Sequence, residues 1–259
     1  MKVVLLAGGL GTRLREETEF RPKPMVPIGS QPILWHIMKT FAHYKHQEFI
    51  VCTGYKAEVI REYFRNFETM NLDFTIEING NGSSSTKLLG KLAEFGWKVT
   101  VSDTGPTTPT GGRLHQIKNY VGNETFMCTY GDGVADINID DLLKFHKSHG
   151  RLATLSAVQP ASRFGVLDIE NNGKVNRFQE KPKSENWVNA GYFVFEPEIF
   201  NYLDLHSTLE NEPLSQIAAE GQLMAFKHEG FWQPMDTYRE TTMLTEMWEQ
   251  GTAPWKIWQ

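Results

Sequence analysis

Short apolar runs alternate with segments of helical spacing through the first half of the chain. Residues 3–6 and 48–53 are mostly apolar, and the lack of strict polar–apolar alternation predicts strands that are buried on both faces. Residues 31–46 and 57–67 carry apolar side chains at intervals of three and four, which is typical of helices packed on a core. Two strand–helix units in series predict a parallel sheet with right-handed crossovers.

The second half continues the alternation of strands and helices. Asn172 and Gly173 favour a tight turn between two short strands, 163–169 and 173–178. The other predicted strands are 74–78, 99–103, 124–130, 153–158, 187–195 and 223–228; the other predicted helices are one that ends near residue 120, then 139–149, 198–203, 213–220 and 238–249. This order predicts an α/β fold: a single three-layer, Rossmann-like domain over residues 1–259, with a mostly parallel central sheet and a small β-hairpin portion.

Two segments depart from these patterns. Residues 79–96 open with a run of Asn, Gly and Ser that cannot pack a core. We expect a mobile loop or insertion there, or a segment that orders over a ligand or a neighbouring subunit. The tail, residues 248–259, holds Trp248, Trp255 and Trp258. So much indole near the end of the chain predicts burial, against the same chain or against another subunit.

Composition narrows the class of protein. Of 259 residues, 40% are hydrophobic and 22% are charged, which is ordinary for a globular protein. No apolar run reaches the roughly 18 residues that a membrane span requires, so we expect a cytoplasmic protein. Cys52 and Cys128 lie in apolar, strand-like runs and are predicted to be buried free thiols. The formal net charge of −5 offers no broad basic face, which argues against nucleic acid as a partner.

A glycine-rich loop after the first strand is the main candidate for chemistry. Its glycines, in the stretch AGGLGTR at 7–13, let backbone N–H groups approach a ligand, which suits a polyphosphate. Arg13 offers several donors to phosphoryl oxygens, and Lys23 offers a compact charge from a backbone stiffened by flanking prolines. The loop matches neither GxxxxGK[ST] nor GxGxxG, so neither a P-loop ATPase nor a dinucleotide site is indicated. Such a loop also occurs as an ordinary turn in α/β proteins.

Further candidates lie beyond the ends of predicted strands. Thr108 and Arg113 belong to a stretch of hydroxyls and glycines before a helix, which suits an anion or a base edge, or is a plain capped turn. Asp132 either binds Mg²⁺ or caps a turn, and the place of Asp236 just before a predicted helix suits an N-cap. Lys181 is either a second cation for phosphate or a solvated surface residue.

These residues occur in the order found in a known family. GGLGTRL followed by RPKPMVPIG resembles the signature of the sugar-1-phosphate nucleotidylyltransferases, and the resemblance covers nearly the whole chain. It implies a mainly nucleotide-binding part, 1–135, and a part, 136–259, that binds the sugar phosphate and ends in a helix. The resemblance implies nucleotide contacts from Leu6, Ala7, Gly8, Gly9, Leu10, Gly11, Thr12, Arg13, Lys23, Thr108, Arg113 and Gly131, sugar-phosphate contacts from Glu180, Lys181, Asn189 and Gly191, metal ligation by Asp132 and Asp236, and catalytic roles for Arg13, Lys23 and Lys181.

The stretch TGGRL at 110–114 is similar to the branch of this family that uses CTP and glucose 1-phosphate. That resemblance implies Mg²⁺-assisted, in-line nucleotidyl transfer, with CDP-glucose supplied to deoxysugar or polysaccharide biosynthesis. Family members form homo-oligomers, hexamers among them, so we expect a homo-oligomer. The eight histidines show no zinc-ligand spacing, and zinc is not expected.

Three other functions compete with this interpretation. The nearest is a sister enzyme with the same chemistry on UTP, dTTP or GTP. A second is a glycosyltransferase of the GT-A type, whose Asp-x-Asp metal motif does not fit the spacing of Asp132 and Asp136. A third is a non-catalytic relative, against which the retained charges at Arg13, Lys23 and Lys181 argue.

Overall fold

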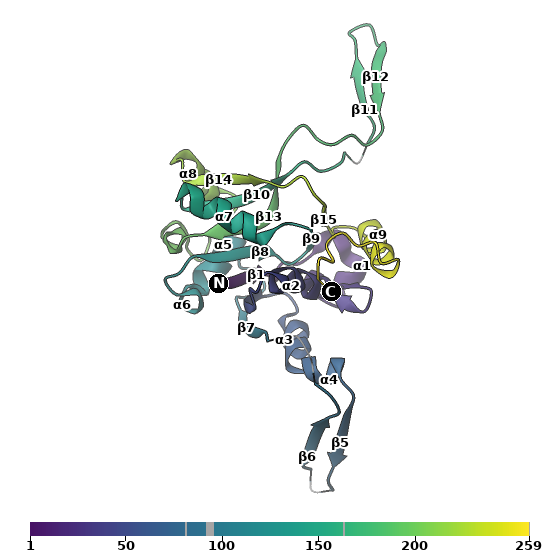
Figure 1. Cartoon of the computed structure of the whole chain (residues 1–259), viewed down its shortest axis with the longest axis vertical. Coiled ribbons are helices and arrows are strands. Elements are labelled where there is room, and N and C mark those ends of the chain that lie inside the picture. Colours follow the sequence, from purple (N-terminus) through teal and green to yellow (C-terminus); the bar gives the residue numbers. More distant parts are fainter. Residues whose placement is uncertain (81, 92–95, 163, 259) are drawn as a thin grey trace.

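A seven-stranded sheet forms the centre of the molecule (Figure 1). In spatial order its strands are β14 (Leu223–Lys227), β10 (Ala153–Val158), β13 (Val188–Phe195), β8 (Phe126–Tyr130), β1 (Lys2–Leu6), β4 (Glu48–Thr53) and β7 (Lys98–Asp103). β13 runs antiparallel to both β10 and β8, and the other pairs of this sheet are parallel. The predicted α/β fold with a mostly parallel sheet is therefore confirmed. The structure is a computed structural model that describes residues 1–80, 82–91, 96–162 and 164–258.

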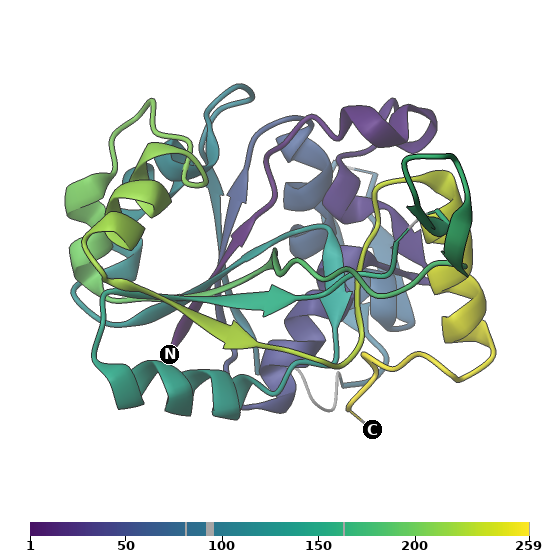
Figure 2. The same cartoon turned by 90° about the horizontal axis from the view of Figure 1, so that it is seen from above.

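Apolar side chains of the strands point alternately to two cores, one on each face of the sheet. On β1, Val3 and Leu5 pack into the first core, while Val4 and Leu6 pack into the second. The first core is covered by α2 (Ile33–His43), α3 (Ala57–Arg65), α7 (Ile139–His149) and α9 (Tyr238–Glu249), and the second by α5 (Thr110–Gln116), α6 (Lys118–Val121), the 3-10 helix η3 (Pro197–Tyr202) and α8 (Glu212–Ala219). Figure 2 shows helices on both sides of the sheet, which is the predicted three-layer arrangement.

Most predicted elements are found within a few residues of their expected ends. The helix expected from residue 31 begins at Ile33, directly after Pro32, and the one expected over 57–67 ends at Arg65 before a short α4 (Phe67–Asn71). Cys52 and Cys128 are buried free thiols, as predicted. Within the part of the chain that the structure describes, no helix is long and apolar enough to cross a membrane.

Two hairpin arms project from opposite ends of the body in Figure 1. The arm β11 (Val166–Ile169) with β12 (Val175–Gln179) confirms the hairpin predicted through Gly173, whose φ is 87°; Arg163 of that prediction lies outside the described residues. The other arm corrects the expectation of an unstructured 79–96 segment, because Ser84–Leu88 forms β6 and pairs with β5 (Phe74–Ile78). Its side chains pack no core, as expected, but local backbone pairing does not require one. Residues 81 and 92–95 of the segment lie outside the described residues.

The tryptophan-rich tail packs against its own chain, which is the first of the two arrangements expected for it. Gln259 lies outside the described residues. Trp255 and Trp258 are buried beside Trp35 and His36 of α2. The indole N–H of Trp255 donates to Nδ1 of His36 at 3.3 Å, and Nε2 of His36 lies 3.0 Å from the carbonyl of Ile28. An indole N–H only donates and a carbonyl only accepts, so His36 is neutral with its proton on Nε2.

This histidine predicts a pH dependence of stability. Burial lowers the pKa of His36 from 6.5 to about 4. The unfolded chain therefore binds more protons between those values, and the His36 contribution to the free energy of unfolding falls by about 3 kcal/mol as the pH is lowered from 6.5 to 4. Urea unfolding across this range is expected to show a shallower pH slope for His36→Gln than for the wild type. His206→Gln, on an exposed loop, is the matched control, and equal slopes for His36→Gln and the wild type would contradict the assignment.

Candidate active site

A cavity of about 450 Å³ opens beyond the carboxyl ends of the parallel strands β1 and β8. Its walls are Leu6, Gly8, Gly9, Gly11, Thr12, Arg13, Lys23, Pro24, Thr108, Pro109, Thr110, Arg113, Tyr130, Gly131, Asp132 and Asp236. Ligands of open parallel sheets bind at this edge, since the loops that follow the strands converge there. The loop after β1, the loop after β8 and the segment before α5 therefore meet around one space.

Two glycines of the loop after β1 are required by close contacts. Gly11 has a φ of 63°, and a Cβ there would lie 2.8 Å from Cγ2 of Thr18. A Cβ on Gly8 would lie 2.0 Å from Nη1 of Arg113. The loop can hold its path only with hydrogen atoms at these positions, which leaves its backbone open to a ligand.

Lys23 enters the cavity from a short 3-10 helix, η2 (Lys23–Met25), that follows Pro22. Its ammonium donates to Oδ2 of Asp132 and to Oδ1 of Asp236, each at 2.6 Å. The two carboxylate oxygens therefore lie within about twice that distance of each other. The side chain of Lys23 is only 9% exposed, so these charges interact in a poorly solvated environment.

The two aspartates meet because a short two-stranded ladder joins distant parts of the chain. β9 (Gly133–Ala135) pairs antiparallel with β15 (Trp232–Pro234), and the N–H of Met235 donates to the carbonyl of Asp132 at 2.8 Å. Asp132 immediately precedes β9, and Asp236 follows β15 by two residues. The ladder thus fixes the separation of the two carboxylates.

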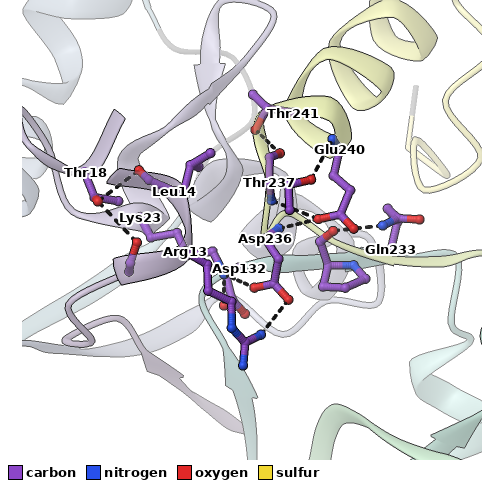
Figure 3. A network of polar contacts seen from close by, with 12 residues as sticks. Arg13, Leu14, Thr18, Lys23, Asp132, Gln233, Asp236, Thr237, Glu240 and Thr241 are labelled. Atoms are coloured by element: carbon purple, nitrogen blue, oxygen red, sulfur yellow. Dashed lines mark hydrogen bonds and ion pairs between the residues drawn. The ribbon is translucent and has the colours of Figure 1, made fainter. Parts of the chain in front are cut away.

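Asp236 is not the N-cap of α9. Thr237 is the cap, in a capping box with Glu240, whose Oε2 accepts from the backbone N–H groups of both Asp236 and Thr237. The Asp236 carboxylate is left to bind Lys23 and, at 2.9 Å, Nη1 of Arg13. Figure 3 shows Arg13, Lys23 and Asp132 gathered beside Asp236, with Thr237 and Glu240 at the start of α9.

The contacts favour the charged forms of Lys23 and Asp236. Burial alone would lower the pKa of Lys23, but attraction and hydrogen bonding from Asp132 and then Asp236 outweigh it and raise that pKa. Burial would likewise raise the pKa of Asp236, but Lys23 and then Arg13 outweigh burial and lower it. The site therefore holds two cations and two carboxylates in contact.

The paired carboxylates suit a magnesium ion. Mg²⁺ accepts one or two carboxylates and takes its other ligands from substrate phosphates and water. Asp132 and Asp236 already converge on a single cationic group, and their side chains are 35% and 16% exposed, which leaves access from the cavity. Across the described ranges no set of three or more His, Cys, Asp or Glu side chains is arranged to bind a metal, so a site built wholly of protein ligands is not indicated.

Arg113 lines the cavity, but its guanidinium forms several hydrogen bonds within the protein. It donates to the carbonyls of Gly8, Thr53 and Gly105 and to Oγ1 of Thr104, over 2.7–3.0 Å. Burial lowers its pKa. The side chain thus connects the loop after β1 to the ends of β4 and β7, and it forms part of the cavity wall.

Tyr130, which lines the cavity, contacts two of the predicted sugar-site residues. The hydroxyl of Tyr130 accepts from Nδ2 of Asn189 at 3.3 Å and donates to Oε1 of Glu210 at 2.5 Å. A Cβ on Gly191, whose φ is 82°, would lie 2.3 Å from the Tyr130 ring. Asn189 and Gly191 therefore hold the tyrosine from β13, behind the cavity wall.

The structure does not bring Lys181 and Glu180 to this cavity. Both follow β12 at the base of an arm, where the Lys181 ammonium lies 3.6 Å from the Glu180 carboxylate. A second cavity, of about 880 Å³, shares Asp236 with the first and is lined by Trp187, Trp232 and Lys183 among others. Of the predicted nucleotide contacts, Ala7 is buried and Leu10 is exposed, and neither lines the first cavity.

Sequence reasoning missed several cavity residues. Pro24, Pro109, Thr110 and Tyr130 line the space, and all four lie within two residues of one that was predicted, so proximity in sequence was an available signal. Glu210 gave no such signal, since it lies in a polar loop before α8 with no motif around it. Its partners are residues 80 and 100 positions away in the chain.

Comparisons with known proteins agree with this geometry. A sequence profile of the nucleotidyl transferase family matches residues 2–238. The glucose-1-phosphate cytidylyltransferase of Salmonella typhi is 50% identical over 262 aligned residues, which cover 100% of both chains. The probable glucose-1-phosphate cytidylyltransferase of Bacillus subtilis is 42% identical over 260 residues, again with 100% of both chains covered. The likeness is therefore spread along the whole length.

Solved structures share the fold at lower identity. A UDP-glucose pyrophosphorylase complexed with UDP-glucose is 16% identical with a TM-score of 0.68, covering 96% of this chain and 98% of that one. A putative glucose-1-phosphate thymidylyltransferase from Bacillus anthracis is 18% identical with a TM-score of 0.68, covering 95% and 94%. At these identities the likeness concerns the arrangement of the elements.

Proposed function

The chain belongs to the nucleotidyl transferase family, and we propose that it transfers the cytidylyl group of CTP to α-D-glucose 1-phosphate, giving CDP-glucose and diphosphate. The observation that carries this choice of substrates is the 50% identity, over the full length of both chains, to a relative named for that reaction. The reaction class is also supported by the cavity, where Lys23, Arg13 and two aspartates meet beside a glycine loop. The product would supply deoxysugar or polysaccharide synthesis.

The chemistry requires positioning and charge neutralisation more than proton transfer. A phosphate oxygen of the sugar ester attacks the α-phosphorus of CTP in line, a P–O bond forms, and the bond from the α-phosphorus to the departing diphosphate breaks. A phosphate monoester is already nucleophilic, so a strong general base is not needed. Arg13 neutralises charge on the departing diphosphate, and Lys23 holds the reacting phosphates together. Asp132 and Asp236 would hold Mg²⁺, which supplies further neutralisation of the triphosphate when bound.

The two ends of the cavity divide the nucleotide between them. Phosphates belong at the end with Arg13 and Lys23, where the glycine loop offers backbone N–H groups. The base and ribose then lie toward Thr108, Thr110 and Tyr130, beside the N-terminus of α5. Of the remaining predicted nucleotide residues, Leu6, Gly8, Gly9, Gly11, Thr12 and Gly131 line the same cavity and are proposed to contact the nucleotide through backbone groups, whereas Ala7 and Leu10 do not line it.

The sugar phosphate is proposed to approach from the second cavity, which shares Asp236 with the first. Its aromatic walls suit the apolar face of a hexose, and Lys183 adds a cation there. Glu180 and Lys181 stand at the base of the adjoining arm and line neither cavity, whereas Asn189 and Gly191 act through Tyr130. In this proposal residues 136–259 supply most of the sugar-phosphate site and residues 1–135 most of the nucleotide site.

An initial-rate panel tests this function. Diphosphate release is measured for CTP, UTP, dTTP and GTP, each crossed with several hexose 1-phosphates, with and without Mg²⁺. CTP with glucose 1-phosphate and Mg²⁺ is expected to give the highest kcat/KM. A clear preference for another triphosphate would identify a sister enzyme, and hexose transfer from a nucleotide sugar without diphosphate release would identify a glycosyltransferase.

We also propose that the two hairpin arms dock on further copies of the chain. A two-stranded ribbon is marginally stable alone, and both arms expose large apolar side chains, among them Ile78 and Phe164. Replacing Ile78 and Phe178 with aspartate is expected to lower the molar mass measured by light scattering, because buried charge would disrupt the contacts. Thr75→Asp, on an exposed position of β5, is the matched control. A wild-type chain with the mass of a monomer would contradict the proposal.

The proposed substrates also suggest where the protein works. CTP and glucose 1-phosphate are phosphorylated metabolites of the cell interior, so we place the reaction in the cytoplasm. Both cysteines are free thiols in the structure, which fits a reducing compartment.

A further inference from the structure

Glu210 sets the direction of two hydrogen bonds at the base end of the cavity. Its Oε1 accepts from the hydroxyl of Tyr130 at 2.5 Å, and its Oε2 accepts from Oγ1 of Thr110 at 2.6 Å. An ionised carboxylate has no proton to give, so both hydroxyls must be donors in these bonds. Tyr130 and Thr110 both line the cavity, one from the end of β8 and the other from the start of α5.

Each hydroxyl has one proton, and in both residues that proton is committed to Glu210. Thr110 Oγ1 also accepts from the N–H of Leu209 at 3.0 Å, and the Tyr130 hydroxyl accepts from Asn189 at 3.3 Å. Each oxygen can therefore still accept a hydrogen bond but has no proton left to donate. A ligand group that reaches either hydroxyl oxygen can therefore form a hydrogen bond with it only by donating one.

The tyrosine is held firmly in this state. Burial, then the charge of Glu210 and their hydrogen bond, raise the pKa of Tyr130, so its hydroxyl keeps the proton. Gly191 and Asn189 support the ring from β13. The orientation of the hydroxyl is thus a property of the fold and is present before a ligand arrives.

Pyrimidine bases differ at the group that such acceptors would read. Cytosine carries an amino group at C4, where uracil and thymine carry a carbonyl oxygen. An amino group can donate a hydrogen bond to such a hydroxyl oxygen. A carbonyl oxygen cannot, so the two oxygens would face each other without a hydrogen bond. A site built for one hydrogen-bond pattern rejects the other strongly.

We propose that Glu210 is a specificity-determining residue, which by holding the protons of Tyr130 and Thr110 makes the base end of the cavity accept an amino-bearing pyrimidine and reject uracil and thymine. This rests on the proposed function in one respect, namely that the pyrimidine lies at this end. Glu210 acts through the two hydroxyls and is a positioning residue for specificity.

Glu210→Gln is the sharpest test, because it preserves shape and changes one hydrogen-bond direction. The new amide nitrogen must donate to one of the two hydroxyls, which frees that hydroxyl to donate into the cavity and to satisfy a carbonyl oxygen. The ratio of kcat/KM for CTP to kcat/KM for UTP is expected to fall by about 10- to 100-fold, in part through a rise for UTP. Glu212→Gln, two residues away on α8, is the matched control and should leave the ratio unchanged.

The outcomes separate this inference from the proposed function. A wild-type enzyme without preference for CTP would overturn the proposed function itself. A wild-type preference that survives in Glu210→Gln, or an equal fall in kcat/KM for both nucleotides, would overturn the role of Glu210 and leave the function standing. Should Glu210→Gln lack a cooperative thermal transition, Tyr130→Phe gives the same readout, since loss of one acceptor should also lower the CTP to UTP ratio; an unchanged ratio there would overturn the inference.

Discussion

Replacing Lys23 with methionine is expected to lower kcat by at least about 100-fold, because deleting one charge-stabilising donor of a transition state costs roughly 3 kcal/mol. Methionine keeps most of the buried volume of the side chain, which is only 9% exposed, so the loss reports the charge. The measurement is steady-state diphosphate release with saturating CTP, glucose 1-phosphate and Mg²⁺. A Lys23→Met enzyme with wild-type kcat would contradict the proposed role.

A second readout for this variant does not depend on turnover. In the wild type the Lys23 ammonium bonds both aspartates at 2.6 Å, so it occupies the oxygens that a divalent cation would need. Without the ammonium, Asp132 and Asp236 lose the cation that they share and only Asp236 keeps a partner, Arg13, so Mg²⁺ should relieve the repulsion between the two carboxylates. The Mg²⁺-induced rise in Tm is therefore expected to be larger for Lys23→Met than for the wild type. Lys144→Met, on the exposed face of α7, is the matched control and should behave as the wild type does.

The elements of the fold could be predicted where local pattern and packing agree. Residues 139–149 show this, since the segment has helical spacing and an acidic first turn and is followed by Gly150, and the observed α7 has these bounds. The β6 strand was missed because Ser84–Leu88 buries no face, so no apolar period marks it. Its pairing with β5 comes from the turn at Gly82, which a reading of hydrophobic pattern alone does not register.

The charged residues and the glycine loop of the candidate site could be found in the sequence. Arg13, Lys23, Asp132 and Asp236 each stand within two residues of a glycine or proline, which marks them in the sequence, and the structure gathers all four in one cavity with the predicted Gly8, Gly9 and Gly11. The three-residue strands that bring the aspartates together are too short to show a period. Glu210 could not be found for a different reason, because its role depends on hydrogen bonds to residues on other elements. Specificity thus arises from tertiary contacts that leave no local pattern.

Lys181 shows what a sequence motif leaves open. The EKP stretch resembles a family motif, yet in this structure the lysine bonds its neighbour Glu180 at the base of an arm, outside the first cavity. A motif specifies residue types in a row, whereas a site also requires the direction of the backbone, and Lys181 has a φ of 45° that turns the chain sharply here. Its catalytic role stays a prediction.

Asp236→Asn is expected to lower kcat by roughly 100- to 1,000-fold and to raise the Mg²⁺ concentration needed for half-maximal rate. Asparagine keeps the shape but removes a charge that contacts Lys23, Arg13 and the proposed ion. The substitution also leaves the backbone intact, since Thr237 caps α9 and Glu240 accepts from the Asp236 N–H. Rates measured over a Mg²⁺ titration at saturating CTP test both effects.

Asp136→Asn is the control that distinguishes a metal site of Asp132 and Asp236 from one of Asp132 and Asp136. Asp136 lies four residues beyond Asp132, but its carboxylate contacts His228 at 3.0 Å and does not line the first cavity. If Asp132 and Asp236 are the pair that matters, Asp136→Asn should keep kcat and Mg²⁺ dependence near wild type, while Asp132→Asn should resemble Asp236→Asn. A metal site built instead from Asp132 and Asp136, as in a glycosyltransferase, would reverse that order. Because the β9–β15 ladder sets Asp132 against Asp236 and turns Asp136 toward His228, we expect the first pattern.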